Sequence, residues 1–533
     1  MSFDLVDEPW VPVQRGGQQA TVSLREAVIE AHAIDDLAPP RPTMVPALLR
    51  QVLLPVVIDA LDVPRSEDAW AARWTSGRFD AGEIDGYLDR HRDRFDLFHP
   101  TKPFAQVGGL ASTTGETKPS SLLVPSVASG NNVPLFSARL ESEPPALSPP
   151  EAALWLLHTH CWDTAAIKTG AEGDPRVKRG KTTGNPTGPL GQFEAVIPMG
   201  RSLFDTLLLN TPIHPDGLPA GDRPQWRADP ADATWEERPP HGLLDLLTWQ
   251  SRRIRLFPSH GADGPVVREV LVCAGDRLEA NHDLEPHAAW RRNPRPRANQ
   301  APVTPRRPRA GRRAWQGLDA LLALNPPPDG EAEASALIRQ AGDLLEVLGE
   351  DYPLRVLTAG VLYGNQAAVV DHVVADLMPL PVAALRQEQA AWELLVGVVT
   401  QTHYLSLALN GLHAELRRAR GGEPVPWDRG QRPDAELVQR LDLQVRRLLT
   451  GLQEQPEREE EAEWAWQEAA HREVWRLAER MLDAVPPTAF AGREDPAGNR
   501  VHRPANAEAF FRAQVAKTLP NRGDPPPTLK EAS

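Results

Sequence analysis

The sequence predicts an α+β protein, in which a large irregular amino-terminal domain of mixed helices and strands is followed by a carboxyl-terminal four-helix bundle. Three observations support this prediction. A short strand pair is indicated at the amino terminus, proline and glycine recur up to about residue 350, and apolar residues recur at helical spacing in four segments beyond residue 380. We therefore expect a mixed domain over 1–380, a bundle over 381–520 and a disordered tail over 521–533.

The mixed domain begins with "WVPVQRGGQQATVSL" (10–24), where a Gly-Gly turn signal between two short alternating runs predicts a small β-unit. Ser23 and Glu26 then stand at capping-box spacing, which predicts the start of a helix. Further helices are indicated by "PALLRQVLLPVVIDAL", "EAALWLLHTHCWDTAAI" and "EASALIRQAGDLLEVLG", and a strand by "VREVLVCAG". The 54 prolines of the chain indicate many ordered loops between these elements.

The predicted bundle rests on apolar residues that recur every three to four positions along successive segments. Helices with one apolar face each can bury those faces by packing together, so we expect a four-helix bundle. The stripes are Trp392, Leu395, Val399, Leu405, Leu409, Leu412 and Leu416; Leu437, Leu441, Val445, Leu448 and Leu452; Trp464, Val474, Met481 and Val485, closed by Pro486; and the segment "PANAEAFFRAQVAKTL".

The composition limits the class of protein. With 533 residues, 41% hydrophobic and 24% charged, the chain is long enough for two or three domains. No apolar run approaches the ~18 residues needed to cross a bilayer, and "MSFDLVDEPWVPVQ" lacks the pattern of a secretory signal, so we expect a cytoplasmic protein without a membrane span. The two cysteines, Cys161 and Cys273, exclude a disulfide framework and a four-cysteine zinc site.

Basic residues are clustered, although the formal net charge is −14. Residues 289–313, "AWRRNPRPRANQAPVTPRRPRAGRR", hold nine arginines and no acid, and "RVKRGK" (176–181) adds four positive charges. A locally basic surface on an acidic protein suits a polyanion contact that is restricted to one site. The alternative is a disordered, proline-broken arginine loop without a partner.

The best-defined catalytic signatures are missing, because the sequence contains no GxxxxGK[ST] loop, GxSxG elbow or HExxH helix. In "HTHCWD", His158, His160, Cys161 and Asp163 are residue types that bind metals. Neither helical nor strand geometry would bring all four side chains to one face, so packed structural residues are favoured over a metal site. We predict no catalytic residue, no metal and no cofactor.

A glycine-rich stretch, "KTTGNPTGPLGQFEAV" (181–196), is more informative. Its glycines, Gly184, Gly188 and Gly191, have no Cβ and would let backbone N–H groups approach a ligand closely, while the interleaved prolines stiffen the loop. The stretch therefore suits a nucleic-acid or phosphate contact, with a plain surface turn as the alternative.

A second stretch, "VLYGNQAAVV" (361–370), places Gly364, Asn365 and Gln366 between two apolar runs. These residue types favour turns or hydrogen bonding. From the residues alone, a turn between two helices, or between a helix and a strand, is favoured.

Several motifs together resemble the CasA family, the large subunit of the type I-E CRISPR surveillance complex Cascade. Each motif is loose, but their order is specific and they span the chain. They are "DEPWVPV", "FDLFHPTKPFAQV" (95–107), "LLVPSVASGNNVPLF" (122–136), the glycine-rich stretch with "FDTLLLN" (204–210) after it, and "LYGNQAAVV".

The resemblance implies a non-enzymatic subunit with a large mixed domain and a four-helix bundle. Such a subunit recognises the protospacer-adjacent motif of double-stranded DNA, largely from the minor groove, and starts the strand separation that leads to an R-loop. The partners implied are target DNA, crRNA, the other Cascade subunits and the helicase-nuclease that the complex recruits, with no membrane.

The family's motif-binding positions are carried over to two places. In the family, an Asn-Gln pair at a turn acts as a wedge beside the motif, so Gln366 would be the wedge and Gly364 its hinge. The glycine loop would lie along the minor groove, where the pattern of donors and acceptors is degenerate and several related motifs would be accepted. The residues concerned are Gly188, Pro189, Leu190, Gly191, Asn365, Gln366 and Ala367.

Other contacts are carried over less closely. The family uses a lysine near the middle of the chain for the motif, and the corresponding region here is the arginine-rich segment, in which Arg291 and Arg292 are the candidates. Lys178, Arg179 and Lys181 are the further candidates for contact with the DNA backbone. A second family loop contacts the crRNA end and neighbouring subunits, and Asn131, Asn132 and Phe136 of "SGNNVPLF" are its expected counterparts.

Two other classes of function stay open at this point. One is a metal-dependent phosphohydrolase built around the dipeptide of His282 and Asp283, although ordinary surface polarity also explains that pair. The other is a purely structural ribonucleoprotein subunit, which would bind crRNA and protein neighbours without any preference among flanking sequences.

Overall fold

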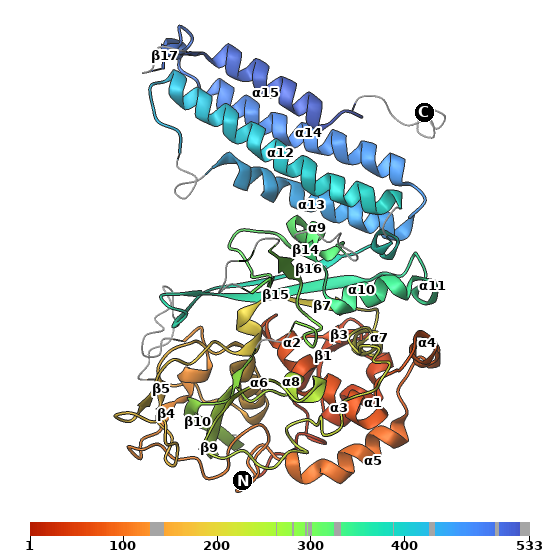
Figure 1. Cartoon of the computed structure of the whole chain (residues 1–533), viewed down its shortest axis with the longest axis vertical. Coiled ribbons are helices and arrows are strands. Elements are labelled where there is room, and N and C mark those ends of the chain that lie inside the picture. Colours follow the sequence, from red (N-terminus) through yellow and green to blue (C-terminus); the bar gives the residue numbers. More distant parts are fainter. Residues whose placement is uncertain are drawn as a thin grey trace. The chain divides into compact units, whose positions relative to one another are not determined.

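The computed structural model describes residues 1–127, 143–262, 264–279, 282–293, 296, 301–323, 332–386, 389–425, 432–495 and 500–522 (Figure 1). The chain divides into two compact units. Unit 1 comprises Met1–Ala310, Asn325–Val347 and Arg355–Leu377, and unit 2 comprises Gly311–Leu324, Leu348–Leu354 and Met378–Ser533. Unit 1 mixes helices and strands whereas unit 2 is dominated by helices, so the predicted α+β class is confirmed.

Unit 1 begins with the predicted strand pair. Strands β1 (Val11–Arg15) and β2 (Gln18–Val22) pair antiparallel around the Gly-Gly turn, and β3 (Asp36–Leu37) extends the sheet on the other side of β1. Helix α1 (Leu24–Ile29) starts where the capping signal predicted, because the Ser23 hydroxyl accepts a hydrogen bond from the Glu26 N–H.

A long apolar helix lies in the core of unit 1. It consists of α2 (Met44–Leu48), a π-helical turn (Leu49–Leu53) and α3 (Leu54–Leu61). Pro55 cannot donate to the carbonyl of Gln51 and its ring crowds that carbonyl, which explains the widened turn. This helix is long and apolar enough to cross a membrane, so the expectation that no run approaches that length was wrong; 83% of it is buried inside the unit.

The π-helical turn places Arg50 against a buried acid. The Arg50 guanidinium donates two hydrogen bonds to the Glu285 carboxylate, at 2.5 and 2.9 Å, and a third of 2.8 Å joins Arg50 to His287 Nδ1. His287 Nε2 lies 3.1 Å from the Asn210 amide oxygen. This buried polar cluster joins segments that are more than 70 residues apart in the sequence.

This part of the chain contains further helices. They are α4 (Glu67–Ser76), α5 (Ala81–His91), α6 (Pro149–Trp162), α7 (Leu203–Leu209), α8 (Leu243–Leu247), α10 (Ala336–Asp343) and α11 (Leu345–Leu348). The predicted helix "EAALWLLHTHCWDTAAI" is α6, which ends at Trp162, five residues before the end of that stretch.

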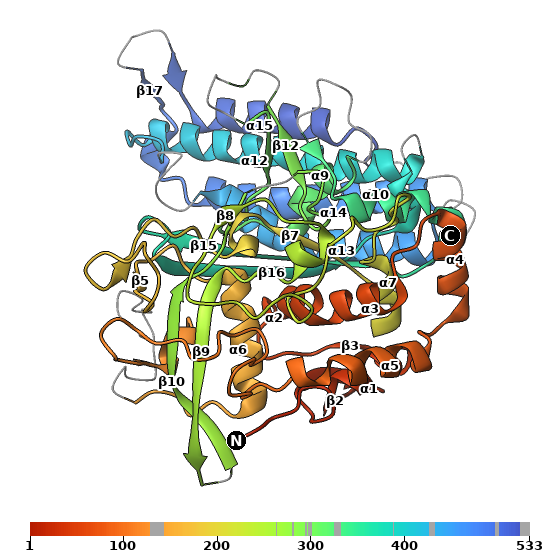
Figure 2. The ribbon, with the colours of Figure 1, turned by 60° about the horizontal axis from the view of Figure 1, so that its bottom comes forward.

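Three sheets shape the side of unit 1 that concerns function. In the first, β9 (Arg252–Gly261) and β10 (Gly264–Ala274) form a long hairpin beside α6 (Figure 2). Strands β4 (Lys118–Pro119) and β5 (Lys168–Thr169) pair with β10, and β6 (Lys181–Thr182) pairs with β5. The second pairs β15 (Arg355–Gly364) with both β7 (Ala195–Met199) and β16 (Val369–Pro379). The third is formed by β13 (Val303–Pro305), β12 (Trp290–Arg292) and β14 (Ala332–Glu333), and a separate pair by β8 (Glu237–Arg238) and β11 (Arg277–Leu278).

Unit 2 contains the predicted bundle. Its long helices are α12 (Ala390–Ala419), α13 (Pro433–Glu454), α14 (Glu459–Asp483) and α15 (Pro504–Thr518), and α12 packs against the other three. Shorter elements of this unit are α9 (Leu318–Leu321), β17 (Arg493–Glu494) and β18 (Val501–His502). The bundle is confirmed as a helical region.

Four residues of the predicted apolar stripes are half-buried: Trp392 and Met481, and two for which a nearby residue takes the buried place. Val399 and Trp464 are half-buried, and Val398 and Trp466 take the fully buried places. A 3.6-residue period allows such a shift wherever apolar residues stand near one another. Of the predicted tail, Asn521 is hydrogen-bonded to the side chains of Gln467 and Glu463, and residues 523–533 lie outside the described part of the chain.

Candidate nucleic-acid interface

The "YGNQ" stretch forms the turn of a β-hairpin, so the prediction of a turn next to a helix was wrong. Asn365, Gln366 and Ala367 join β15 to β16, and all three adopt positive φ, at 37°, 58° and 57°. Consecutive non-glycine residues in this region are uncommon and cost free energy. The turn leaves Asn365 and Gln366 exposed and displays their amide groups.

Contacts on both sides hold this turn in place. The Ala165 N–H donates to the Ala367 carbonyl at 2.8 Å, and the Tyr363 hydroxyl donates to the Trp162 carbonyl at 2.6 Å. Burial raises the pKa of Tyr363, so the phenol stays protonated and can donate throughout the neutral range. The tip of the hairpin is thus fixed to the carboxyl-terminal end of α6 and the residues after it.

The glycine loop packs against the same end of α6. A Cβ on Gly188 would lie 2.4 Å from the Cys161 carbonyl oxygen, and one on Gly191 would lie 2.4 Å from the Tyr363 hydroxyl. The Gly188 N–H also donates to the Asp163 carbonyl at 2.8 Å. Close packing against backbone therefore requires glycine at 188, and at 191 a Cβ would displace the Tyr363 side chain.

The loop exposes only part of the predicted motif-binding set. Gly188, Pro189 and Leu190 are buried, and Leu190 has no exposed surface. A short 3-10 helix (Pro189–Gln192) turns the chain so that Gly191 and Gln192 are the half-buried residues at the surface. Within residues 188–192 a ligand can therefore reach Gly191 and Gln192, whereas the Leu190 side chain belongs to the core.

A buried ionic cluster lies beneath both segments. Asp163 pairs with Lys168 at 2.6 Å and with the Arg252 guanidinium, which also donates to the carbonyls of Thr164 and Pro186 at 2.9 and 2.7 Å. Burial alone would raise the pKa of Asp163, but Lys168 and Arg252 hold it below its usual value. Arg252 thereby joins the loop after α6 to the glycine loop.

A cleft of about 570 Å³ opens between the glycine loop and the hairpin. We call it the hairpin cleft. Its lining includes Gly184, Gly191, Gln192, Arg277, Arg307, Tyr363 and Ala367. Arg307 is exposed and, among the described residues, has no ion-pair partner, whereas Arg277 lies over the Trp235 ring at 4.1 Å and donates to the Thr183 carbonyl.

Sequence reasoning did not single out these two arginines. Arg307 stands in the arginine-rich segment that was noted, but nothing distinguished it from its neighbours. Arg277 is isolated from other basic residues in the sequence, and only the pairing of β11 with β8 brings it to the cleft.

The basic turn at 178–181 lies at the surface of unit 1. The backbones of Lys178 and Lys181 exchange hydrogen bonds of 2.9 and 3.1 Å across Arg179 and Gly180, whose φ values are both positive. The side chains of Lys178, Arg179 and Lys181 are exposed, and no ion pair to any of them occurs among the residues described. Their charges are available to a polyanion.

The two arginines predicted to contact the DNA motif lie on β12. Arg291 and Arg292 are exposed, but the Arg292 guanidinium is 3.4 Å from the Glu333 carboxylate, which also pairs with Arg339 at 2.9 Å. Part of the Arg292 charge is thus balanced within the chain. Asn131, Asn132 and Phe136 lie outside the described residues.

The possible metal ligands of α6 have separate partners. His158 Nε2 lies 3.1 Å from the Thr43 hydroxyl, His160 Nε2 donates to the Ala105 carbonyl at 2.8 Å, and Cys161 is buried. In the part of the chain that the structure describes, no group of three or more His, Cys, Asp or Glu side chains is arranged to hold a metal ion. Of the second pair, His282 Nδ1 is 2.9 Å from Asp283 and the His282 ring lies edge-on to Trp290.

Comparisons with known proteins agree on one family. The model of the family described as CRISPR-associated protein Cse1 matches residues 4–477. The chain is 30% identical over 426 residues to a CRISPR-associated protein CasA/Cse1 of Thermus thermophilus, which covers 79% of each protein.

Solved structures resemble the whole chain. Cse1 of Acidimicrobium ferrooxidans and Cse1 of Thermobifida fusca are both 33% identical, with TM-scores of 0.81 and 0.82, and each match covers 98% of this chain and 99% of the other. A chain of a "CRISPR RNA-guided surveillance complex", 21% identical with a TM-score of 0.66 over 91% of this chain and 99% of that chain, shares the fold.

Proposed function

Because the chain belongs to the CRISPR-associated protein Cse1 family, we propose that it is the large subunit of a type I-E CRISPR RNA-guided surveillance complex. In that role it recognises the protospacer-adjacent motif of double-stranded DNA from the minor groove and starts the opening of the duplex. It acts in the cytoplasm as a non-enzymatic subunit. Its partners are target DNA, crRNA, the other subunits and the recruited helicase-nuclease.

One observation carries the proposal. The exposed amides of Asn365 and Gln366 stand on a hairpin turn that is tied by hydrogen bonds to the same end of α6 against which the glycine loop packs. A turn held this firmly can press a side chain into the base stack, since unstacking costs only a few kcal/mol per step. The hairpin thus supplies the wedge and the glycine loop the adjoining surface.

The hairpin cleft supplies further contacts. Gln192 and the backbone of Gly191 face it and suit the degenerate acceptors of the minor groove, which gives tolerant recognition of the motif. Arg277 and Arg307 line the same cleft, and their guanidinium groups suit phosphate oxygens on either side of the groove. Guide pairing reads the target itself, so the protein needs to check only the flanking bases.

A reconstituted complex, with and without this chain, tests the function on targets that differ only in the flanking trinucleotide. We expect the chain to raise affinity for a subset of flanking sequences. Equal binding of every flanking sequence would instead assign the chain to the purely structural class. Nucleotide turnover by the purified chain with a divalent metal would favour the phosphohydrolase.

Gln366→Ala should slow R-loop formation about tenfold on linear duplex and much less on a target with a pre-opened bubble, because the bubble makes the wedge unnecessary. Tenfold corresponds to about 1.4 kcal/mol of barrier, which is within the cost of unstacking one step. Stopped-flow fluorescence of a base analogue next to the motif measures both rates. Gln18→Ala, at the exposed β1–β2 turn, is the matched control, and equal slowing on both targets would exclude a wedge.

Replacing Lys178, Arg179 and Lys181 together by glutamine should weaken binding to all DNAs alike. If each side chain meets one phosphate, the slope of log K against log salt should fall by up to about 2.7. The double variant Arg78→Gln and Lys102→Gln removes two exposed charges elsewhere in unit 1 and should leave the slope unchanged. An unaltered slope in the triple variant would place the turn outside the DNA interface.

A further inference from the structure

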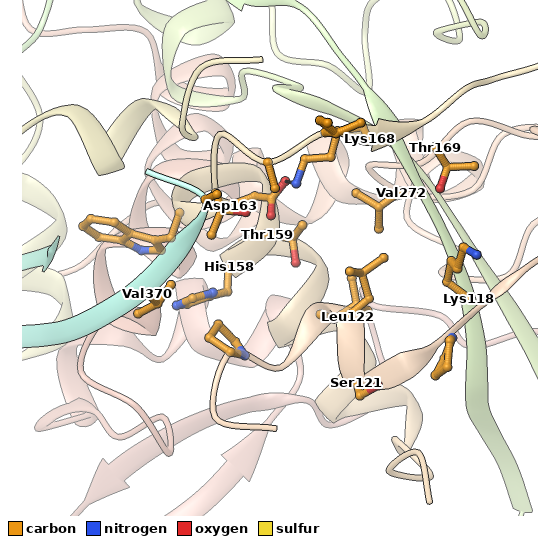
Figure 3. Close-up of a pocket in the computed structure, with 18 residues that line it drawn as sticks. Lys118, Ser121, Leu122, His158, Thr159, Asp163, Lys168, Thr169, Val272 and Val370 are labelled. Carbon is orange, nitrogen blue, oxygen red and sulfur yellow. Dashed lines mark ion pairs between the residues drawn. The ribbon is translucent and has the colours of Figure 1, made fainter. Parts of the chain in front are cut away.

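A second cavity, of about 360 Å³, lies beside the same hairpin (Figure 3). We call it the Lys168 pocket. Ala368, just before β16, and Val370 within it line this pocket, whereas Val361, Tyr363 and Ala367 of the same hairpin line the hairpin cleft. Its volume lies within the ~300–1,000 Å³ range of sites for small molecules.

One wall of the pocket is polar and buried. Asp163 and Lys168 lie together there with Thr159 beside them, as Figure 3 shows. The Lys168 side chain is 7% exposed, and its ammonium pairs with Asp163 at 2.6 Å. An ammonium has three N–H donors, and Asp163 is its one partner among the described residues, so donors remain for a ligand that carries an acceptor oxygen.

A second buried group in the lining lacks a partner. The Ser121 hydroxyl has almost no exposed surface and, within the described residues, makes no hydrogen bond. An unsatisfied buried hydroxyl costs free energy, and a ligand acceptor in the cavity that takes a hydrogen bond from it would recover that cost. The Thr159 hydroxyl donates to the Trp155 carbonyl at 2.7 Å, which leaves its oxygen free to accept.

The rest of the lining is apolar, with a cation at the far side. Leu122, Val272 and Val370 form flat aliphatic walls, and Ile167 is 61% exposed. Lys118 stands across the pocket from Asp163 and is 44% exposed, and within the described part of the chain it has one weak ion pair, with Glu116 at 3.8 Å. A ligand that suits this lining has a flat face, ring acceptors and a separate negative charge.

We propose that the Lys168 pocket binds a single unpaired nucleotide of a nucleic-acid strand. The base lies between the aliphatic walls, with a ring carbonyl on the Lys168 ammonium and a second acceptor of the nucleotide at the Ser121 hydroxyl, at the other end of the pocket, and the phosphate meets Lys118. Inorganic phosphate alone would leave the aliphatic walls unused, and an apolar ligand would leave the ammonium unsatisfied. The choice of a nucleic-acid strand rests on the proposed function, whereas the chemistry of the pocket does not.

The purified full chain allows a direct test with three probes: uridine 5′-monophosphate, uridine and inorganic phosphate. Saturation-transfer NMR should detect the monophosphate, with a dissociation constant on the order of 1 mM. Uridine should bind about tenfold more weakly, and inorganic phosphate should not displace the base signal. Displacement by phosphate alone, or no transfer to the monophosphate, would overturn the proposal.

Two variants link the binding to the pocket. Ser121→Ala should weaken binding of the monophosphate about tenfold while the unfolding temperature stays the same or rises, because the change removes an unsatisfied hydroxyl. Lys118→Ala should weaken binding about fivefold, and Lys102→Ala, a lysine of similar exposure with an equally weak ion pair, should not. Equal losses in the two lysine variants would mean surface charge attraction and would overturn the proposal.

Cross-linking in the reconstituted complex distinguishes the two sources of the nucleotide. A 4-thiouridine in the guide RNA, or a 4-thiothymidine in either DNA strand, should cross-link to peptides that contain Leu122 or Ile167. Whichever strand does so is the source, and no cross-link from any strand would contradict the proposal. The flanking-trinucleotide assay tests the proposed function separately, so the two ideas can fail independently.

Discussion

Replacing Arg252 with methionine is expected to lower the free energy of unfolding of unit 1 by about 3–5 kcal/mol, because it breaks a buried ion pair and leaves charged and polar groups without a partner. The Arg252 side chain is 1% exposed, and it contacts Asp163 and the carbonyls of Ser251, Thr164 and Pro186. Hydrogen exchange in urea measures the loss locally, which matters in a chain of two units whose unfolding need not be two-state.

The same variant should also abolish discrimination among flanking sequences, since Arg252 joins the loop after α6 to the glycine loop. Amides of residues 163–192 should exchange at least tenfold faster, including the Gly188 N–H that donates to Asp163. Arg255→Met, on the same strand, removes one hydrogen bond of 3.0 Å to the Leu110 carbonyl and should cost at most about 1.5 kcal/mol. Similar effects of the two variants would show that Arg252 does not organise the interface.

Local signals in the sequence were enough for part of the fold. The β1–β2 hairpin follows from a Gly-Gly pair between alternating runs, and α1 from Ser23 at its N-cap. The bundle follows from stripes of apolar residues, because a helix of more than 20 residues repeats its signal several times. Residue-level errors such as Val399 in place of Val398 do not alter which helices form.

The arrangement of the interface could not be read in the same way. The turn at 365–367 has no glycine at its left-handed positions, so its residues do not suggest a tight hairpin, and only the surrounding contacts hold it. The pair of Asp163 and Arg252 spans 89 positions in the sequence. Burial of Leu190 also depends on how the loop packs against α6, which the glycine spacing does not reveal.

Lowering the pH from 6.5 towards 4 should destabilise unit 1 steeply, because three of its histidines are buried. Burial lowers the pKa of His158 to about 3 and that of His160 and His287 to about 4, against an ordinary value of 6.5. Below pH 6.5 these residues take up protons in the unfolded chain but stay neutral in the folded one. The free energy of unfolding therefore decreases as the pH is lowered, by up to about 4 kcal/mol per pH unit when all three histidines contribute.

The acidic residues of unit 1 alter this loss of stability little between pH 6.5 and 4.5. Burial alone would raise the pKa of Glu285, but Arg50 and His287 lower it to about 2. The contribution of Glu285 to the free energy of unfolding is therefore lost only below about pH 4.5. Burial raises the pKa of Asp36 and Asp222, which opposes the loss only where carboxylates begin to protonate. Between pH 6.5 and 4.5 the histidines dominate, and urea midpoints measured across this range should fall accordingly.

His160 provides the sharpest check of this cause. Its Nε2–H donates to the Ala105 carbonyl and its Nδ1 is buried without a partner among the described residues, so protonation would create a second buried N–H with no acceptor. Arg253 and Arg252 add like charge nearby. His160→Gln should reduce the slope of the free energy of unfolding against pH by about 1.4 kcal/mol per pH unit, the contribution of one proton, whatever its effect on stability at pH 7. His32→Gln changes an exposed histidine and should leave the slope as it is; a slope unaltered by both would place the acid sensitivity elsewhere.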